Sequence, residues 1–510
     1  MMETCQVDSS HLGNTCPLDF SCFLRASRLY CFNSTDSYLD YVDEQREMTY
    51  SFDTLWKISH IFWTIAPIVF WFGFARIITH LKTNNVDSNI KAVFIFEFLI
   101  ITVPTILSVN VANEAVEYVV VVMTAGMLLL VWRTKCWQMA KMRVFEIGTR
   151  PCMLTLSRAT TNFLTSICIL AIDFKSFPSD FRKTRRYGVG LMDTGIGLFV
   201  FTMGSVSRRP KTNKDLVRMW GNVLPLLFLG LARTVVIMVI KYSQDEHEYG
   251  THLNAFFTLG FTKLFGTLLS SVVNNDNLLL PLGCAVLIAH EVMLQNGVAE
   301  FVMDSNVHRI SFLTSNREGV CAIPGFIGIY LVSMFLGKCL QSNKPLNYRQ
   351  YMRKLKYMAV VALCLWIVLC PCVVIIGIAR VTCNISYAIW TMAISLTITL
   401  FFTIMFDLVL NTIWPIHSPT SVQADTEHGK NDVGKMQTLQ YRHELPPFVE
   451  ALNQNGLLYF LLSNVLTGLV NIFLKPEHRT AIQGIGILML YTGLSTGFVY
   501  ILRSFGIKIA

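Results

Sequence analysis

Apolar runs of roughly 17 to 25 residues recur along almost the whole chain, and this repetition constrains the fold more than any other feature. In the hydrocarbon core of a bilayer only helices and closed barrels satisfy the backbone, and the sequence lacks the alternating strands of a barrel. The composition agrees, because 53% of the 510 residues are hydrophobic and only 15% are charged, against about 25% charged in soluble domains. The sequence therefore predicts an all-α, polytopic membrane protein folded as one helical bundle.

We expect about 13 transmembrane helices, each long enough to cross a bilayer. A polar tail over 1–58, without an apolar core of signal-peptide length, precedes a transmembrane domain over 59–510. The eighth span is the least regular, because His290 and Glu291 lie near its end. The expected spans are 59–79, 92–110, 116–132, 155–172, 190–206, 221–241, 252–272, 278–293, 322–338, 357–379, 386–412, 455–474 and 482–502.

The distribution of Lys and Arg predicts the orientation of the bundle. The net charge of +9 does not indicate a nucleic-acid partner, because the basic residues are spread among loops. The basic segments 133–143, 207–218 and 338–356 follow odd-numbered spans, so the positive-inside rule places them in the cytosol and the N-terminus in the lumen. The segment 414–450, rich in Ser, Thr, Asp and Gly, is expected to be a flexible cytosolic loop.

The N-terminal tail fits a lumenal location. It carries the sequon Asn33-Ser34-Thr35, which predicts a glycoprotein if the tail is translocated. It also carries four cysteines, which an oxidising lumen could pair, although unpaired thiols remain an equal alternative. The four are Cys5, Cys16, Cys22 and Cys31.

The segment from Asp173 to Asp193 places five basic residues between two carboxylates and two apolar spans. Pro178 forbids a continuous helix, so a hairpin is expected between the fourth and fifth spans, on the lumenal side, against the positive-inside rule. One interpretation is that the cations snorkel toward lipid phosphates while the carboxylates cap helices. The other is that they hold an anionic, phosphate-bearing ligand.

Other polar groupings carry weaker signals. The histidines within 245–254 are too irregularly spaced for a convincing zinc site, so we expect no metal. Arg317 and Glu318 precede a Pro-Gly break, and Asn455, Asn464 and Asn471 are spaced to share one helical face, which more often binds other helices. Motifs of soluble hydrolases, metalloproteases, P-loop proteins and dinucleotide-binding domains are absent from the sequence.

Four ordered motifs between 170 and 475 are similar to a known family. The hairpin residues Asp173-Phe174, Phe177-Pro178, Lys183-Thr184, Tyr187-Gly188 and Leu191-Met192-Asp193-Thr194-Gly195 resemble the DFxxFPRRFxKTExYGxSLMDxG signature of the inositol acyltransferases of glycosylphosphatidylinositol (GPI) anchor synthesis, the PIG-W type. The other three motifs are Glu248 to Asn254 with Phe256-Phe257-Thr258, Asn316 to Gly319, and Asn455-Gly456-Leu457 with Asn464, Thr467-Gly468 and Asn471.

The resemblance implies a multi-pass enzyme of the endoplasmic reticulum membrane. Such an enzyme moves a fatty acyl group, usually palmitoyl, from acyl-CoA to the inositol ring of glucosaminyl-phosphatidylinositol. Acyl-CoA is then a co-substrate, no cofactor is needed, and membrane lipids surround the protein. The chain departs from the family pattern at Ser179-Asp180, at Leu253 and in its N-terminal tail. A lipid transporter and a degenerate lipid-binding family member are the alternative functions.

The reaction assigns roles to the charged residues. An inositol hydroxyl is a poor nucleophile, so Asp173 is the predicted general base, Lys183 the cation that stabilises the oxyanion, and Asp193 the residue that positions them. A pairing of Asp173 with Lys183 alone remains the alternative. The predicted substrate-binding residues are Arg182, Arg185, Arg186, Tyr187, His252, Asn254, Arg317 and Asn464.

Overall fold

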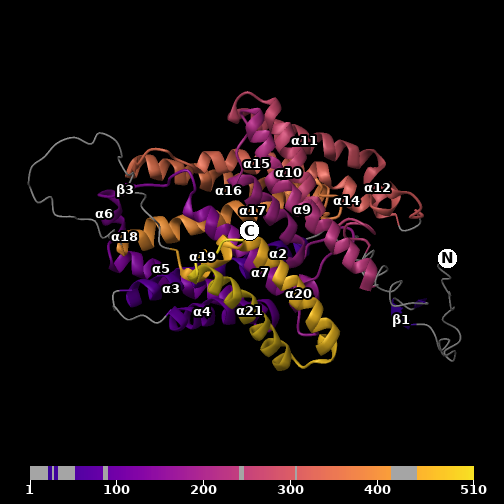
Figure 1. Cartoon of the computed structure of the whole chain (residues 1–510), viewed down its shortest axis with the longest axis horizontal. Helices are drawn as coiled ribbons and strands as arrows, with labels where there is room; N and C mark the ends of the chain where they lie inside the picture. The colour runs from indigo at the N-terminus through magenta and orange to yellow at the C-terminus, as the bar shows by residue number, and fades with distance from the viewer. Residues whose placement is uncertain are drawn as a thin grey trace, which may run out of the picture.

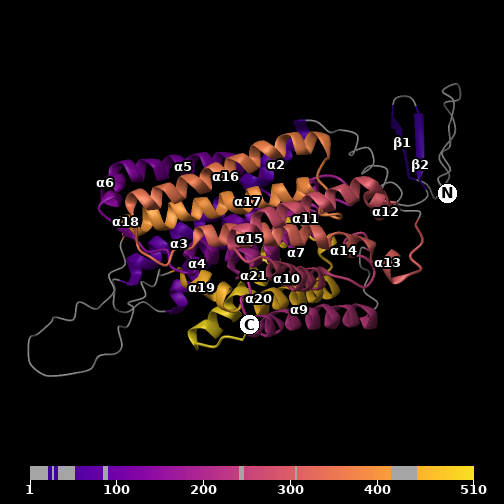
Figure 2. The ribbon, with the colours of Figure 1, turned by 90° about the horizontal axis from the view of Figure 1, so that it is seen from above.

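Long helices packed into one bundle make up most of the described protein (Figure 1), and many run in the same direction in the second view (Figure 2). In the part of the chain that the structure describes, 11 helices are long and apolar enough to cross a membrane, which confirms the all-α membrane prediction. This computed structural model describes residues 21–25, 28–32, 52–83, 90–240, 246–304, 307–414 and 445–509.

Most of the helices follow one another with short connections. The helices are α2 (Phe52–Ile65), α3 (Pro67–Thr83), α4 (Ile90–Asn110), α5 (Val116–Arg133), α6 (Cys136–Lys141), α7 (Cys152–Ala171), α8 (Thr194–Val206), α9 (Asn213–Ile240), α10 (Ala255–Val272), α11 (Leu279–Met293), α12 (Ala299–Met303), α13 (Phe312–Ser315), α14 (Arg317–Cys321), α15 (Ile323–Leu340), α16 (Tyr348–Ile375), α17 (Ile385–Phe402), α18 (Asn411–Ile413), α19 (Pro447–Gln454), α20 (Gly456–Leu474) and α21 (Ala481–Ser504). The strands are β1 (Ser21–Arg25), β2 (Arg28–Phe32), β3 (Val144–Phe145) and β4 (Leu346–Asn347).

The fourth and fifth expected spans form helices α7 and α8 but fall outside the 11 candidate spans. Helix α7 is rich in Ser and Thr and carries Arg158 and Asn162, while α8 has only 13 residues. Both helices are largely buried by their neighbours. A helix enclosed by other helices tolerates polar residues that lipid would not, so sequence hydropathy underestimates it. The total of 13 spans stays a prediction.

The doubtful eighth span is a helix in the structure, and its two polar residues have partners. His290 Nε2 hydrogen-bonds the Thr382 carbonyl at 2.9 Å, and Glu291 accepts a hydrogen bond from the Ile385 amide at 2.9 Å. Glu291 thereby satisfies an unpaired amide at the first turn of α17. The span continues through a kink at Gly297, where φ is 102°.

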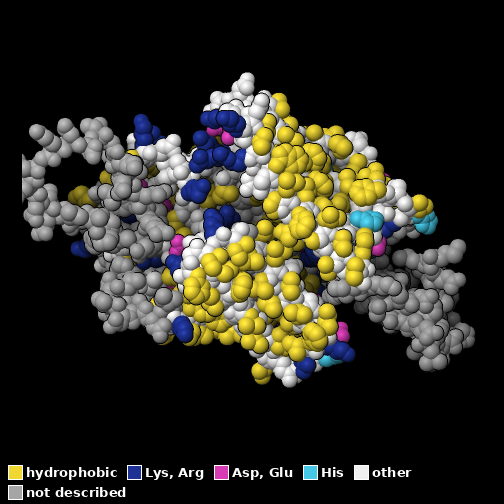
Figure 3. Space-filling model, in the orientation of Figure 1, with side chains coloured by type: hydrophobic (Ala, Val, Ile, Leu, Met, Phe, Trp, Pro, Cys, Tyr) yellow, Lys and Arg dark blue, Asp and Glu magenta, His cyan; other side chains and the backbone are white. Residues whose placement is uncertain are grey.

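Apolar side chains cover the outside of the bundle as well as its core. Helices α5, α9 and α16 expose residues such as Val121, Phe228 and Ile367, and Figure 3 shows hydrophobic side chains in yellow over much of one face. This is the surface expected where lipid replaces water. In the interior, small residues let helices approach closely: a Cβ on Gly337 of α15 would lie 2.0 Å from the Ser205 carbonyl oxygen of α8.

Two predicted boundaries need correction. Helix α2 begins at Phe52, within the predicted 1–58 tail, and Asp53 and Lys57 interrupt the apolar run of its first turns. The predicted 414–450 loop ends too late, because α19 begins at Pro447 and buries Phe448 and Val449 in the core. The rest of that loop, 415–444, lies outside the described residues, so its flexibility stays a prediction.

Before α2, the tail is described only at the antiparallel pair β1 and β2. In its register Cys22 and Cys31 are Cα partners. Cys5, Cys16 and the sequon at Asn33 lie outside the described residues, so the disulfides and the glycosylation stay predictions.

The loops sort to two ends of the bundle. At one, here called the hairpin end, the Gly188 amide donates to the Ile378 carbonyl at 2.8 Å and the Thr251 amide to the Ser315 carbonyl at 2.9 Å. At the other, here called the basic end, β3 pairs with β4. Asp276 forms ion pairs there with Arg209 at 2.8 Å and with Lys338 at 3.5 Å, which brings the basic segments together. This sorting matches the alternation predicted from the sequence. Which end faces the cytosol stays a prediction.

Candidate active site

The segment between α7 and α8 is a tight, well-packed hairpin, as predicted. Pro178 precedes a 3₁₀ turn over 179–181, and Phe181 is buried in the core. Gly190 is required by a close approach, because a Cβ there would lie 2.0 Å from the Arg182 carbonyl oxygen. The hairpin therefore holds its charged side chains on a fixed backbone rather than on a loose loop.

Asp173 lies two residues after the last residue of α7 and is half-buried at the hairpin end. Its Oδ2 accepts a hydrogen bond from Asn471 Nδ2 of α20 at 3.0 Å. Burial raises the pKa of the Asp173 carboxyl above its ordinary value, and the Asn471 hydrogen bond and the charges of Lys183 and Arg182 only partly offset this. A raised pKa makes a carboxylate a stronger base, which suits general base catalysis.

Lys183 is paired with Glu248 rather than with Asp173. Its Nζ lies 2.6 Å and 2.8 Å from the two carboxylate oxygens of Glu248, and the two side chains are 31% and 25% exposed. Lys183 also interacts electrostatically with Asp173. The arrangement is one ammonium group near two carboxylates, of which only Glu248 is hydrogen-bonded to it. The role of Asp173, as the base or only as a partner of Lys183, stays a prediction.

Asp193 is fully buried at the start of α8 and binds other parts of the hairpin end. Its Oδ1 accepts a hydrogen bond from Arg380 Nε at 2.8 Å, and its Oδ2 accepts one from Thr184 Oγ1 at 3.0 Å. Tyr387 donates its hydroxyl hydrogen to the Asp193 carbonyl at 2.7 Å. Because Thr184 follows Lys183 in the chain, Asp193 fixes the backbone that carries Lys183. This geometry fits a positioning role, which stays a prediction.

The remaining basic residues of the hairpin differ in exposure. Arg182 is exposed, whereas Arg185, Arg186 and Tyr187 are half-buried. Arg182, like Lys183, is close enough to Asp173 to interact electrostatically with its carboxylate. Phosphate binding by these residues stays a prediction.

His252 and Asn254 lie in the loop that brings Glu248 to the hairpin. Asn254 is buried, and its side chain caps α10 by accepting from the Phe256 amide at 3.0 Å while donating to the Gly230 carbonyl at 2.9 Å. His252 is half-buried beside Asn316, whose Oδ1 accepts from the His252 amide at 2.8 Å. Asn254 thus holds the loop in place, and substrate binding by either residue stays a prediction.

Arg317 and Asn464 are engaged by nearby backbone. The buried Arg317 donates to the Asp304 carbonyl at 2.6 Å, and Asn464 donates to the Phe460 carbonyl of its own helix at 2.7 Å. The structure records no contact between either residue and Asp173 or Lys183 in the described part of the chain. Their assignment to substrate binding stays a prediction.

Three residues of the site were not assigned from the sequence. Glu248 and Asn471 stand within the quoted motifs, but their partners, Lys183 and Asp173, are far away in the chain. Arg380 gives a signal of its own, because a lone arginine between two apolar spans needs a counter-ion.

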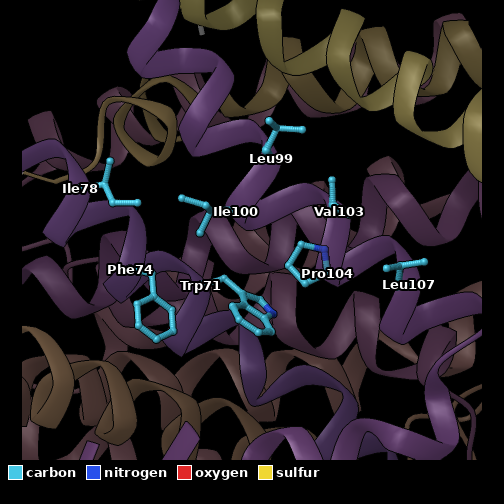
Figure 4. Close-up of a pocket in the computed structure, with 8 residues that line it drawn as sticks. All are labelled: Trp71, Phe74, Ile78, Leu99, Ile100, Val103, Pro104 and Leu107. Atoms are coloured by element: carbon cyan, nitrogen blue, oxygen red, sulfur yellow. The ribbon is translucent and has the colours of Figure 1, made fainter. Parts of the chain in front are cut away.

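A separate groove of about 590 Å³ lies between α3 and α4, and no charged side chain lines it. Figure 4 shows its lining, which is apolar except for the indole nitrogen of Trp71. The eight lining residues are Trp71, Phe74, Ile78, Leu99, Ile100, Val103, Pro104 and Leu107. Since none of them belongs to the hairpin end, the groove is not part of the candidate active site.

The fold and the site define a polytopic helical membrane protein with a carboxylate–ammonium centre at one end of its bundle. A sequence model of the GWT1 family matches residues 45–502, so the chain belongs to the GWT1 family. It is 27% identical over 445 residues to the human protein named glucosaminyl-phosphatidylinositol-acyltransferase PIGW, covering 81% of this chain and 88% of that protein. It is 28% identical over 364 residues to GPI-anchored wall transfer protein 1 of Schizosaccharomyces pombe, covering 70% and 73%, and 31% identical over 372 residues to the protein of the same name in Emericella nidulans, covering 70% and 73%.

Proposed function

We propose that this protein transfers a fatty acyl group, palmitoyl by preference, from acyl-CoA to a hydroxyl group of the inositol ring of glucosaminyl-phosphatidylinositol. The names of the mammalian relatives support the acceptor and the reaction class. The observation that carries the proposal is the half-buried Asp173 carboxylate, held by Asn471 and close to an ammonium group. That pair supplies the base and the cation that acyl transfer to a hydroxyl requires.

The reaction uses Asp173 as the general base. The inositol hydroxyl oxygen attacks the thioester carbonyl carbon while its proton passes to the Asp173 carboxylate. A carbon–oxygen bond forms, the carbon–sulfur bond breaks, and the CoA thiolate leaves. The proton on Asp173 then returns to the thiolate, so the carboxylate is regenerated and no other reactant is consumed.

Lys183 stabilises the negative charge that develops on the thioester oxygen. A fixed cation in a partly buried site is worth more than one in water, and it requires no rearrangement during the reaction. Glu248 orients the ammonium group through two short hydrogen bonds. Asp193, through Thr184, fixes the neighbouring backbone and acts as a positioning residue.

The basic hairpin residues bind the lipid acceptor. Arg182, Arg185 and Arg186 lie on the same hairpin as Lys183, where guanidinium groups suit the phosphodiester of the lipid acceptor. The long apolar helices place the enzyme in a membrane. We assign it to the endoplasmic reticulum because the reaction belongs to GPI-anchor synthesis.

Expression in cells that lack inositol acylation tests this function. The wild-type chain should restore acylated glucosaminyl-phosphatidylinositol, measured by mass spectrometry of extracted lipids, and Asp173→Ala and Lys183→Ala should not, at equal protein level. Lys57→Ala is the matched control, because Lys57 pairs with Asp180 of the same hairpin at 3.3 Å and is 37% exposed. Failure of the wild type to restore acylation, or full acylation by a double variant at Asp173 and Lys183, would contradict the proposal.

A further inference from the structure

Three basic residues, Arg150, Arg158 and Lys263, lie along a line from the basic end into the bundle, and none has an acidic partner among the described residues. Arg150 precedes α7 and is exposed, Arg158 lies in the second turn of α7, and Lys263 lies in the middle of α10. Arg158 is subject to repulsion from Arg150, and Lys263 to repulsion from Arg158. A run of cations inside a membrane bundle is costly and indicates a functional site.

The two inner cations lack carboxylate partners among the described residues. Arg158 donates to the backbone carbonyl of Asn453 at 3.0 Å and to its side chain, both of which are uncharged. Lys263 makes no hydrogen bond or ion pair within the described part of the chain, and the only charge recorded as acting on it is that of Arg158. Cations inside a membrane protein are usually paired with an acidic side chain. A cluster without such partners therefore indicates a binding site for an anionic ligand.

Contacts of residues on the same helical faces place Arg158 and Lys263 beside the same helix, α20. One turn after Arg158, the amide nitrogen of Asn162 lies 2.9 Å from where a Cβ of Gly456 would be, at the start of α20. Seven residues before Lys263, on the same helical face, Phe256 packs against Phe460 of α20 with ring centroids 5.8 Å apart. The cations therefore approach each other beside the first half of α20.

The position of this cluster relative to Asp173 fits one ligand. Arg158 lies 13 residues before the last residue of α7. At about 1.5 Å of rise per residue, this is about 20 Å from the hairpin end. The pantetheine arm of CoA has 13 bonds from its sulfur to its first phosphorus, so it extends about 15 Å at peptide-like bond lengths. The arm therefore covers most of the distance between the cluster and Asp173.

We propose that Arg158 and Lys263, with Arg150 at the entrance, bind the phosphate groups of the acyl donor. This inference rests on the proposed function, because it takes acyl-CoA as the donor. The nucleotide stays at the basic end, the pantetheine arm runs along α7, and the thioester reaches Asp173. The arrangement explains how a donor that enters from one side of the membrane reacts at the other. On the face shown in Figure 3, most Lys and Arg side chains (dark blue) lie left of centre, on the side where Figure 1 labels β3 and α6.

Two acyl donors distinguish an effect on phosphate binding from an effect on the acyl-transfer reaction. Palmitoyl-CoA carries the phosphates, and palmitoyl-pantetheine lacks them but has the same thioester. In purified full-length protein, Lys263→Met and Arg158→Gln should raise the KM for palmitoyl-CoA at least about ten-fold, because each removes a charge-assisted contact. The KM for palmitoyl-pantetheine and for the lipid acceptor should not change. Lys263→Arg should retain the wild-type KM, and the exposed Lys356→Met, near the same end, is the matched control.

Each other result overturns the inference. An unchanged KM for palmitoyl-CoA, or an equal rise for both donors, would show that the cluster does not bind the donor phosphates. A rise in the acceptor KM alone would assign the cluster to the phosphate of the lipid acceptor. If the wild type transfers palmitate from neither donor, the proposed function fails. Equilibrium binding of radiolabelled palmitoyl-CoA to wild type and Lys263→Met then still tests the site, since equal binding would refute it.

Discussion

Replacing Asn471 by Leu should shift the pH dependence of acyl transfer without abolishing it. Asn471 donates its side-chain hydrogen to Asp173 Oδ2 at 3.0 Å, and this hydrogen bond favours the carboxylate form. Leu is similar in size and cannot donate. Loss of the hydrogen bond therefore raises the pKa of the Asp173 carboxyl further, and the acid limb of kcat/KM moves to higher pH.

The size of the expected pKa shift follows from the charge of the Asp173 carboxylate, which accepts the hydrogen bond. A hydrogen bond to an ionised group contributes about 1.5–3 kcal/mol, and the half-buried position of Asp173 favours the lower end of that range. Since about 1.4 kcal/mol is a factor of ten, kcat/KM on the acid limb should fall about ten-fold. At high pH, where Asp173 is ionised in both proteins, the two rates should agree within a few fold.

The assay is acyl transfer by purified protein over a range of pH, with thermal unfolding as the measure of folding. Asn222→Leu is the control, because Asn222 is another asparagine of a long membrane helix and, among the described residues, donates to the Arg218 carbonyl of its own helix, at 3.5 Å. An acid limb that stays in place, with a uniform loss at all pH values, would refute Asp173 as the titrating base.

Three further substitutions test the neighbouring contacts. Glu248→Gln should lower kcat about ten-fold at equal protein level, because it removes the charge that orients the ammonium group; Asp180→Asn, in an exposed pair of the same hairpin, should change kcat by less than about two-fold. Arg380→Met should reduce the stability of the protein by about 3–5 kcal/mol, because Asp193 stays buried and unpaired, and adding Asp193→Asn should restore most of the thermal stability. Gly337→Val should prevent close packing of α15 on α8, measured as loss of folded protein in detergent, and a wild-type melting temperature would contradict it.

The sequence predicted the membrane bundle well, because hydropathy reports directly on what lipid requires of a helix. It was less informative for elements that other helices cover. Helix α7 is too polar to count as a candidate span, yet it lies within the bundle. Helix α19 has only eight residues and follows a polar segment, so it was assigned to the 414–450 loop. In both cases tertiary packing outweighs the local pattern.

The candidate site was predicted in part. The hairpin, its break at Pro178 and the grouping of its charges all follow from local sequence. The partner of Lys183 does not, because Glu248 lies 65 residues away in the chain. Nor can a motif distinguish a residue that binds substrate from one that holds a loop: Asn254 stands in a family motif, and its side chain caps α10.

The most direct test of the central claim is a single-turnover measurement with purified protein and radiolabelled palmitoyl-CoA. The wild type should form palmitoylated glucosaminyl-phosphatidylinositol. Asp173→Asn, which keeps the size of the side chain and removes the base, should bind both substrates and transfer palmitate about 10²- to 10⁴-fold more slowly. Transfer by Asp173→Asn at the wild-type rate would show that the hairpin carboxylate is not the base, and would contradict the account.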